Sequence, residues 1–130
     1  MNRTLIAIIV FLVLMLSSVW EMFYLIDKIE ILQAGVNEIY AYMEKDKEYI
    51  DTDLNIRMID DLEKQWDKDK IFLHALLPHS QLNELSYKIN ALNRHINQND
   101  YNMANTAAAS ILKNCEMILG NFLPSMENIF

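Results

Sequence analysis

The feature that most constrains this chain is a long uncharged stretch close to its first residue. No Asp, Glu, Lys or Arg occurs from Thr4 to Trp20, and only Glu21 interrupts the apolar pattern in the next few residues. A membrane-spanning helix needs ~20 mostly apolar residues to cross a hydrocarbon core ~30 Å thick. The stretch from Thr4 to about Tyr24 meets that requirement, and aromatic residues at its end, such as Phe23, fall where lipid headgroups begin. The sequence therefore predicts a helix that contacts the lipid bilayer.

The charges around this stretch predict its orientation. Arg3 precedes it, whereas all 18 acidic residues follow Val19. Because positive charge favours the cytoplasmic side, we expect residues 1–26 to form a single-pass anchor with its N-terminus in the cytoplasm. Residues 27–130 would then form an extracytoplasmic domain. A cleaved signal peptide is the alternative, but it requires small residues at a cleavage site, and the stretch MLSSVWEMF offers no suitable pair.

Beyond the anchor, apolar residues recur with the period of an α-helix. Steps of three and four residues draw an apolar stripe along four segments, so helices are predicted over residues 27–47, 53–77, 80–98 and 100–122. The stripes comprise Leu25, Ile29, Leu32, Val36, Ile39 and Met43; Ile56, Ile59, Leu62, Trp66 and Leu73, widened by Phe72, Leu76 and Leu77; Leu82, Leu85, Ile89, Leu92 and Ile96; and Ala104, Ala107, Ala108, Ile111, Cys115, Ile118 and Phe122. Two prolines and two glycines are too few for the frequent turns of a sheet. We predict an all-α fold, in which the N-terminal transmembrane helix continues into a small antiparallel helical bundle.

Residues that favour caps or break helices set the expected boundaries. The segment Asp51–Asp53 offers three good N-caps for the second bundle helix. Pro78 should end that helix at residue 77, because proline disfavours helical geometry in the residue before it. Ser80 and Asp100 are the expected caps of the third and fourth helices, and Pro124 should end the fourth. Gly35 lies within the first helix and marks either close packing or a bend.

Composition and motifs exclude several classes of function. The formal net charge of −7, with 18 acidic and 11 basic side chains, leaves no basic stripe for nucleic acid. The single cysteine, Cys115, lies among apolar neighbours, which favours a buried thiol; an intermolecular disulfide is the alternative. His74 and His79 are five residues apart across a proline, which is not the spacing of metal ligands on one helix face. No phosphate-binding loop, nucleophile elbow or distinct carboxylate pair occurs, so we expect no catalytic, cofactor-binding or metal site and no cofactor.

A corner between the second and third bundle helices is the remaining candidate site. It contains Trp66, Pro78, His79 and Leu82, and we expect a structural or interaction role for it. His79 would cap or pack at the bend. A protonated His74 would stabilise the C-terminal end of the preceding helix, because the helix dipole is negative there.

Short motifs along the chain resemble a family of small bacterial membrane proteins known as domain of unknown function 4363. The resemblance rests on the apolar N-terminal anchor, WDKDK (66–70), HSQL (79–82), the Asn99-Asp100 turn and the terminal ENIF (127–130). Gln81 departs from the pattern, because an acidic residue is expected before the leucine. The resemblance implies a single-span protein of the bacterial cell membrane whose relatives accompany other small membrane proteins. It implies no activity.

Two functions from different classes remain open. The first is a non-enzymatic interaction or accessory protein, whose extracytoplasmic bundle packs against a membrane-protein partner or against a second copy of itself. The alternative is an extracytoplasmic ligand- or cation-sensing module that uses the acidic segment EKDKEYIDTDL (44–54) or a groove between helices.

Overall fold

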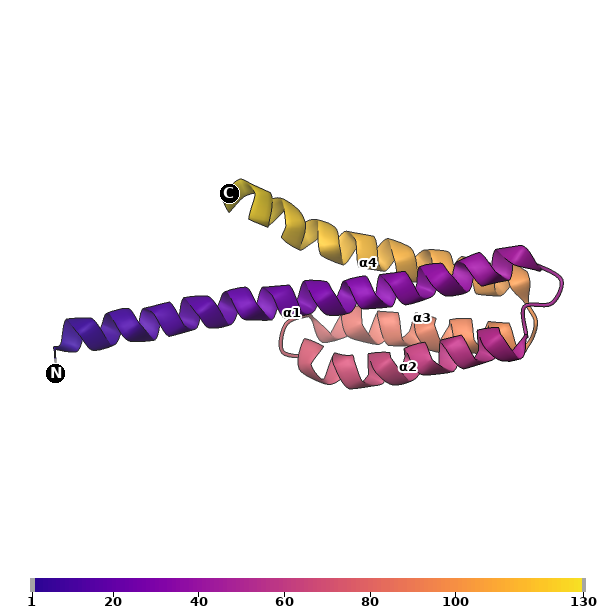
Figure 1. The fold of residues 1–130 in the computed structure, drawn as a ribbon, viewed down its shortest axis with the longest axis horizontal. Coiled ribbons are helices and arrows are strands. Elements are labelled where there is room, and N and C mark those ends of the chain that lie inside the picture. Colours follow the sequence, from indigo (N-terminus) through magenta and orange to yellow (C-terminus); the bar gives the residue numbers. More distant parts are fainter. Residues whose placement is uncertain (1, 130) are drawn as a thin grey trace.

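Four α-helices make up a computed structural model that describes residues 2–129, with side chains described for residues 2–122 (Figure 1). They are α1 (Arg3–Lys45), α2 (Asp53–Leu73), α3 (His79–Asn97) and α4 (Tyr101–Ile129). No strand occurs within residues 2–129, so the all-α prediction is confirmed. Met1 and Phe130, the last residue of the ENIF motif, lie outside the described residues.

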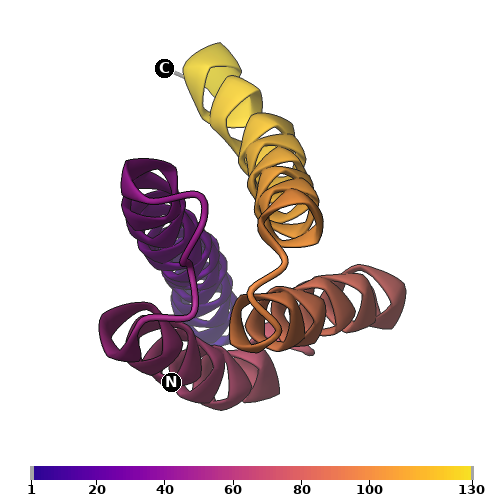
Figure 2. The ribbon, with the colours of Figure 1, turned by 90° about the vertical axis from the view of Figure 1, so that its right-hand side faces the viewer.

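The helices run alternately up and down, and each packs against two neighbours. Helix α1 packs against α2 and α4, and α3 packs against the same two helices (Figure 2). The first half of α1 extends beyond the other helices, and α4 diverges from α1 towards its C-terminal end (Figure 1). We call the end of the bundle where the α1 extension leaves it the proximal end. The opposite end, with the α1–α2 loop and the α3–α4 turn, is the distal end.

The core follows the stripes predicted for α1 and α3. All the stripe residues of these two helices are buried, from Leu25 to Met43 and from Leu82 to Ile96. In α4 the buried positions include Ala104, whereas Ala107 and Phe122 are only half-buried. Side chains that recur every three to four residues share one helix face, so burial of that face accounts for the bundle.

The stripe of α2 differs from the prediction at its proximal end. Ile59, Trp66 and Leu73 are buried at steps of seven residues, but Phe72 is exposed. Adjacent residues point about 100° apart on a helix, so Phe72 cannot share the face that Leu73 occupies. Including Phe72 in the core stripe was therefore wrong.

The predicted end of α2 and the predicted cap of α3 were also wrong. Helix α2 ends at Leu73 rather than at residue 77. The amides of Ala75 and Leu76 donate to carbonyls three residues earlier, which tightens the chain into a turn before Pro78. Pro78 itself occupies the N-cap of α3, and no side chain caps this helix, so Ser80 lies inside its first turn.

The other helix boundaries bear out two predicted caps and correct one predicted end. Thr52 accepts from the amide of Asn55, and Asp100 accepts from the amide of Met103. Helix α4, expected to end at residue 122, continues past Pro124 to Ile129. Pro124 has no N–H for the carbonyl of Gly120, but one missing bond at a solvent-exposed position does not end a helix of this length.

Two asparagines hold the distal end together. Asn99, which has a positive φ of 54°, accepts from the amide of Ile50 (2.8 Å) and donates to the carbonyl of Glu48 (2.9 Å). The buried amide of Asn55 donates to the carbonyl of Ile50 at 2.9 Å. The α1–α2 loop is therefore attached through its backbone to the α3–α4 turn, and Ile50 is completely buried beneath it.

Gly35 marks close packing rather than a bend. A Cβ atom at Gly35 would lie 2.6 Å from Cδ1 of Leu62 on α2. The two helices approach each other here through a glycine facing a leucine, while α1 continues as one helix from Arg3 to Lys45.

Candidate functional site

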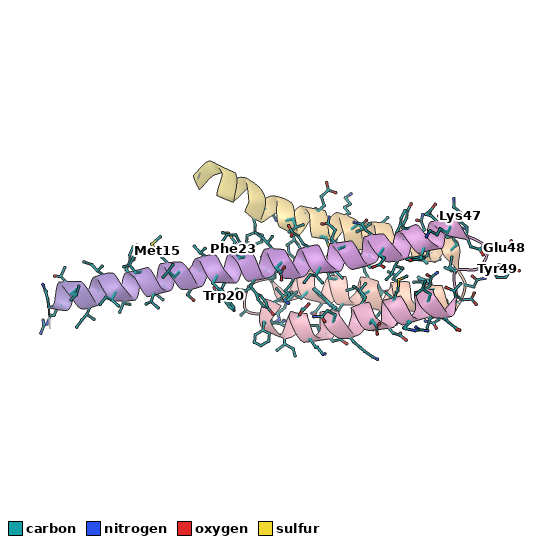
Figure 3. The ribbon with its side chains drawn as sticks, viewed as in Figure 1. Met15, Trp20, Phe23, Lys47, Glu48 and Tyr49 are labelled. Atoms are coloured by element: carbon teal, nitrogen blue, oxygen red, sulfur yellow. The ribbon has the colours of Figure 1, made fainter. Side chains whose placement is uncertain are left out.

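The α1 extension is the largest exposed apolar surface among the described side chains. Between Leu5 and Trp20 its large apolar residues are 43% to 70% exposed. Helix α1 is the one helix within residues 2–129 that is long and apolar enough to cross a membrane, with a mean hydropathy of 2.4 over its best window. Figure 3 shows Met15, Trp20 and Phe23 along this part of α1, outside or at the edge of the bundle.

An aromatic cluster lies where the extension meets the proximal end. The rings of Trp20 and Tyr24 stack with centroids 5.6 Å apart, and Phe72 of α2 meets Tyr24 edge-on at 6.2 Å. Trp20, Tyr24 and Phe72, together with Leu76, line an open and mostly apolar groove of about 250 Å³. Edge-to-face and offset stacked rings are the favourable geometries for aromatic pairs, so the cluster fixes the end of α2 against α1.

A polar group braces the same two helices one turn further into the bundle. Nζ of Lys28 lies 3.7 Å from a carboxylate oxygen of Asp69 and 5.4 Å from the centre of the Tyr24 ring. Gln65 donates to Asp69, which is only 7% exposed. A buried carboxylate requires such partners because its desolvation is costly.

The turn between α2 and α3 brings two histidines into contact. Nδ1 of His74 lies 2.8 Å from Nδ1 of His79, and the rings are 4.7 Å apart at their centroids. A hydrogen bond at this distance requires one ring to donate and the other to accept, so one of the two nitrogens carries no proton. Sequence reasoning treated these histidines separately because their spacing fits no helix face, whereas a turn brings them together. Within the described side chains there is no group of three or more His, Cys, Asp or Glu residues placed to hold a metal ion.

The four residues of the predicted corner do not form one surface. Trp66 is buried and its indole N–H donates to the hydroxyl of Ser86 on α3 at 2.8 Å. Leu82 is also buried, whereas Pro78 and His79 form the exposed start of α3. Trp66 and Leu82 therefore belong to the core, and only the other two can meet a partner.

Sequence reasoning missed the pairs that define the proximal end. The contact of Tyr24 with Phe72 and the ion pair of Lys28 with Asp69 each join residues more than 40 positions apart. The steps of seven residues from Ile59 would have placed Phe72 off the core stripe. Nothing in the sequence pairs Lys28 with a particular carboxylate.

Ionisable groups elsewhere have pKa values set by ordinary structural causes. At the distal end the Tyr101 hydroxyl donates to Glu44, which lowers the pKa of that carboxyl and raises the pKa of Tyr101 to about 12. Burial raises the pKa of the Cys115 thiol to about 12. The buried thiol predicted from the sequence is confirmed, and a thiol with so little thiolate is a poor nucleophile.

The fold defines a class of all-α proteins in which one long apolar N-terminal helix continues into a four-helix bundle. The chain belongs to the family described as Domain of unknown function (DUF4363), whose sequence profile matches residues 19–129. The resemblance noted in the sequence is thus confirmed at the level of the family. No curated protein and no solved structure matched the chain.

Proposed function

We propose that this protein is a non-enzymatic, membrane-anchored interaction or accessory protein. Residues from Thr4 to about Tyr24 cross the cell membrane with the N-terminus in the cytoplasm. The four-helix bundle lies on the extracytoplasmic side and packs against a membrane-protein partner or a second copy of the chain.

One observation carries the proposal: α1 exposes its large apolar side chains along the part that extends beyond the bundle. The large apolar side chains from Leu5 to Trp20 are exposed, whereas Leu25 and Ile29 are buried in the core of the same uninterrupted helix. Exposing such a surface to water would be unfavourable, because removing apolar surface from water stabilises a protein by ~25 cal/mol per Å². The lipid core, or the membrane span of a partner, would remove this surface from water.

The continuity of α1 also supports a role in holding a partner. No loop or proline separates the span from the bundle, so α1 carries the bundle at a fixed distance from the bilayer. A flexible tether would leave a domain free to move, whereas a continuous helix fixes its position and orientation. No specific contact among the described side chains supports the ligand-sensing alternative.

Co-purification from the native membrane tests the proposal. The full-length protein carries a C-terminal tag, is extracted in a mild detergent, and is compared with a variant in which the residues from Thr4 to Val19 are shuffled. Shuffling preserves the hydropathy of the span but changes the face that it presents. A stoichiometric membrane protein or a second copy recovered with the native chain is the expected result. Recovery of a lone monomer with both chains would contradict the interaction role.

A further inference from the structure

We propose that the corner between α2 and α3, residues 71–79, lies in the headgroup layer of the same bilayer that α1 crosses, with Ile71 and Phe72 in contact with phospholipid. This inference rests on the membrane anchoring proposed above. It adds a second site of lipid contact, which begins more than 40 residues after the anchor in the sequence.

The first argument is the exposure of apolar side chains at this corner. Ile71 and Phe72 are each 67% exposed, although Leu73 beside them is completely buried. Both lie on the last turn of α2, and the ring of Phe72 meets Tyr24 at the end of the α1 extension. The apolar surface of Phe72 is thus continuous with the surface of the proposed span through the groove lined by Trp20 and Leu76.

The second argument is depth. A helix rises 1.5 Å per residue, so ~20 residues beginning at Thr4 cross a ~30 Å core and end near Phe23. Tyr24 then lies at the boundary of the hydrocarbon, and the ring of Phe72 lies 6.2 Å from it. The headgroup layer is about 5–7 Å thick on each side of the core. The ring of Phe72 therefore lies within about one headgroup thickness of the hydrocarbon boundary.

Tilting of the span does not remove the corner from the bilayer surface. Membrane helices tilt by ~20° on average, and packed helix axes lie about 8–10 Å apart. Such a tilt moves the neighbouring helix by about 3 Å along the membrane normal. That displacement is smaller than the thickness of the headgroup layer.

The charges near the corner indicate an apolar rather than an electrostatic contact. Lys70 pairs with Asp67 at 3.1 Å, and Lys28 pairs with Asp69 at 3.7 Å. These two cations are neutralised within the protein. Trp20 and Tyr24, which line the groove with Phe72, are residue types that favour the membrane–water interface, because each has an apolar body and a polar group.

Depth-dependent fluorescence quenching tests the inference on the full-length protein in phosphatidylcholine vesicles. In a Cys115→Ala background, single cysteines replace Ile71 or Phe72 and carry an environment-sensitive fluorophore. Val13→Cys reports on the centre of the span, and Leu54→Cys, an exposed leucine at the distal end, is the matched control. Spin-labelled lipids place the quencher either near the headgroup or deep in the acyl chains. Circular dichroism verifies that each variant retains its helices.

The expected result is a loss of fluorescence at positions 71 and 72 that is greater with the shallow quencher than with the deep one. Position 13 should respond most to the deep quencher, and position 54 to neither. If position 13 is quenched but positions 71 and 72 behave like position 54, the corner lies in water and the inference is wrong, while the anchor stands. If position 13 is not quenched, the anchoring proposal itself fails.

Discussion

Replacing Asn99 should destabilise the bundle more than any other single change in its exposed loops. The side chain accepts from the buried amide of Ile50 and donates to the carbonyl of Glu48, so it joins two turns about 50 residues apart in sequence. Its backbone also has a positive φ of 54°, which asparagine and glycine tolerate better than other residues. Two substitutions separate these contributions.

The magnitude follows from what each substitution removes. Asn99→Gly keeps the backbone conformation but loses both hydrogen bonds, each with a net value of ~0.5–1.5 kcal/mol, and leaves the Ile50 amide without its partner. We expect a loss of about 2–3 kcal/mol in the free energy of unfolding. Asn99→Ala loses the same hydrogen bonds but keeps a Cβ in the left-handed region without the polar side chain that lets asparagine tolerate it, which costs roughly 1 kcal/mol more than glycine. Alanine should therefore be the more harmful of the two.

Urea unfolding of the full-length protein in detergent micelles measures both values. Trp66 is almost completely buried between α2 and α3, and in a Trp20→Phe background it is the one tryptophan of the chain. Its fluorescence then reports the unfolding of the bundle alone. If Asn99→Gly unfolds within about 0.5 kcal/mol of the parent, as an ordinary surface substitution would, the proposed attachment of the two turns is refuted.

Three further predictions follow from the described contacts. Cys115 should resist a maleimide at neutral pH in the folded protein, because a pKa raised from 9.0 to about 12 reduces the thiolate population about a thousandfold. In urea the same thiol should react at once, and equal rates in the folded and unfolded states would contradict its burial. Asp69→Ala should lower the free energy of unfolding in urea by about 1–3 kcal/mol, and by less in a Lys28→Ala background. If the two losses are simply additive, the ion pair contributes nothing to stability. The bond from Tyr101 to Glu44 should stabilise the protein most between about pH 4.5 and 10, because Glu44, whose pKa is lowered in the folded state, loses its contribution as pH falls through that lowered value. Tyr101, with a pKa raised from 10.0, loses its contribution as pH rises from 10 to about 12. Tyr101→Phe should remove the alkaline dependence from the unfolding midpoint and reduce the acid one, part of which remains because Lys47 also lowers the pKa of Glu44; an unchanged pH profile would exclude the bond.

The sequence was sufficient for the features that depend on local periodicity. Ile89 and Leu92, for example, are buried because steps of three and four place them on one face, whatever their partners are. The caps Thr52 and Asp100 were also predictable, since a side-chain oxygen there reaches an amide only three residues away. Such relations need no knowledge of the tertiary fold.

Features that depend on which helices become neighbours could not be predicted. Lys28 has 18 acidic residues in the chain as possible partners, and only the packing of α1 against α2 selects Asp69. Asn99 resembles an ordinary turn residue until the α1–α2 loop lies beside it. The predicted end of α4 was too early, because a helix can continue past Pro124 when it loses only the hydrogen bond to the carbonyl of Gly120.

The proposed anchoring and lipid contact both require that α1 crosses the membrane and places the bundle outside the cytoplasm. The most direct measurement is labelling of single cysteines by a membrane-impermeant maleimide in protoplasts that express the full-length protein with Cys115→Ala. Met117 is 60% exposed on α4, and Asn2 lies at the opposite end of the span. If α1 crosses the membrane with the bundle outside, Met117→Cys is labelled in intact protoplasts and Asn2→Cys is labelled only after lysis. Labelling of Met117→Cys only after lysis would contradict this orientation.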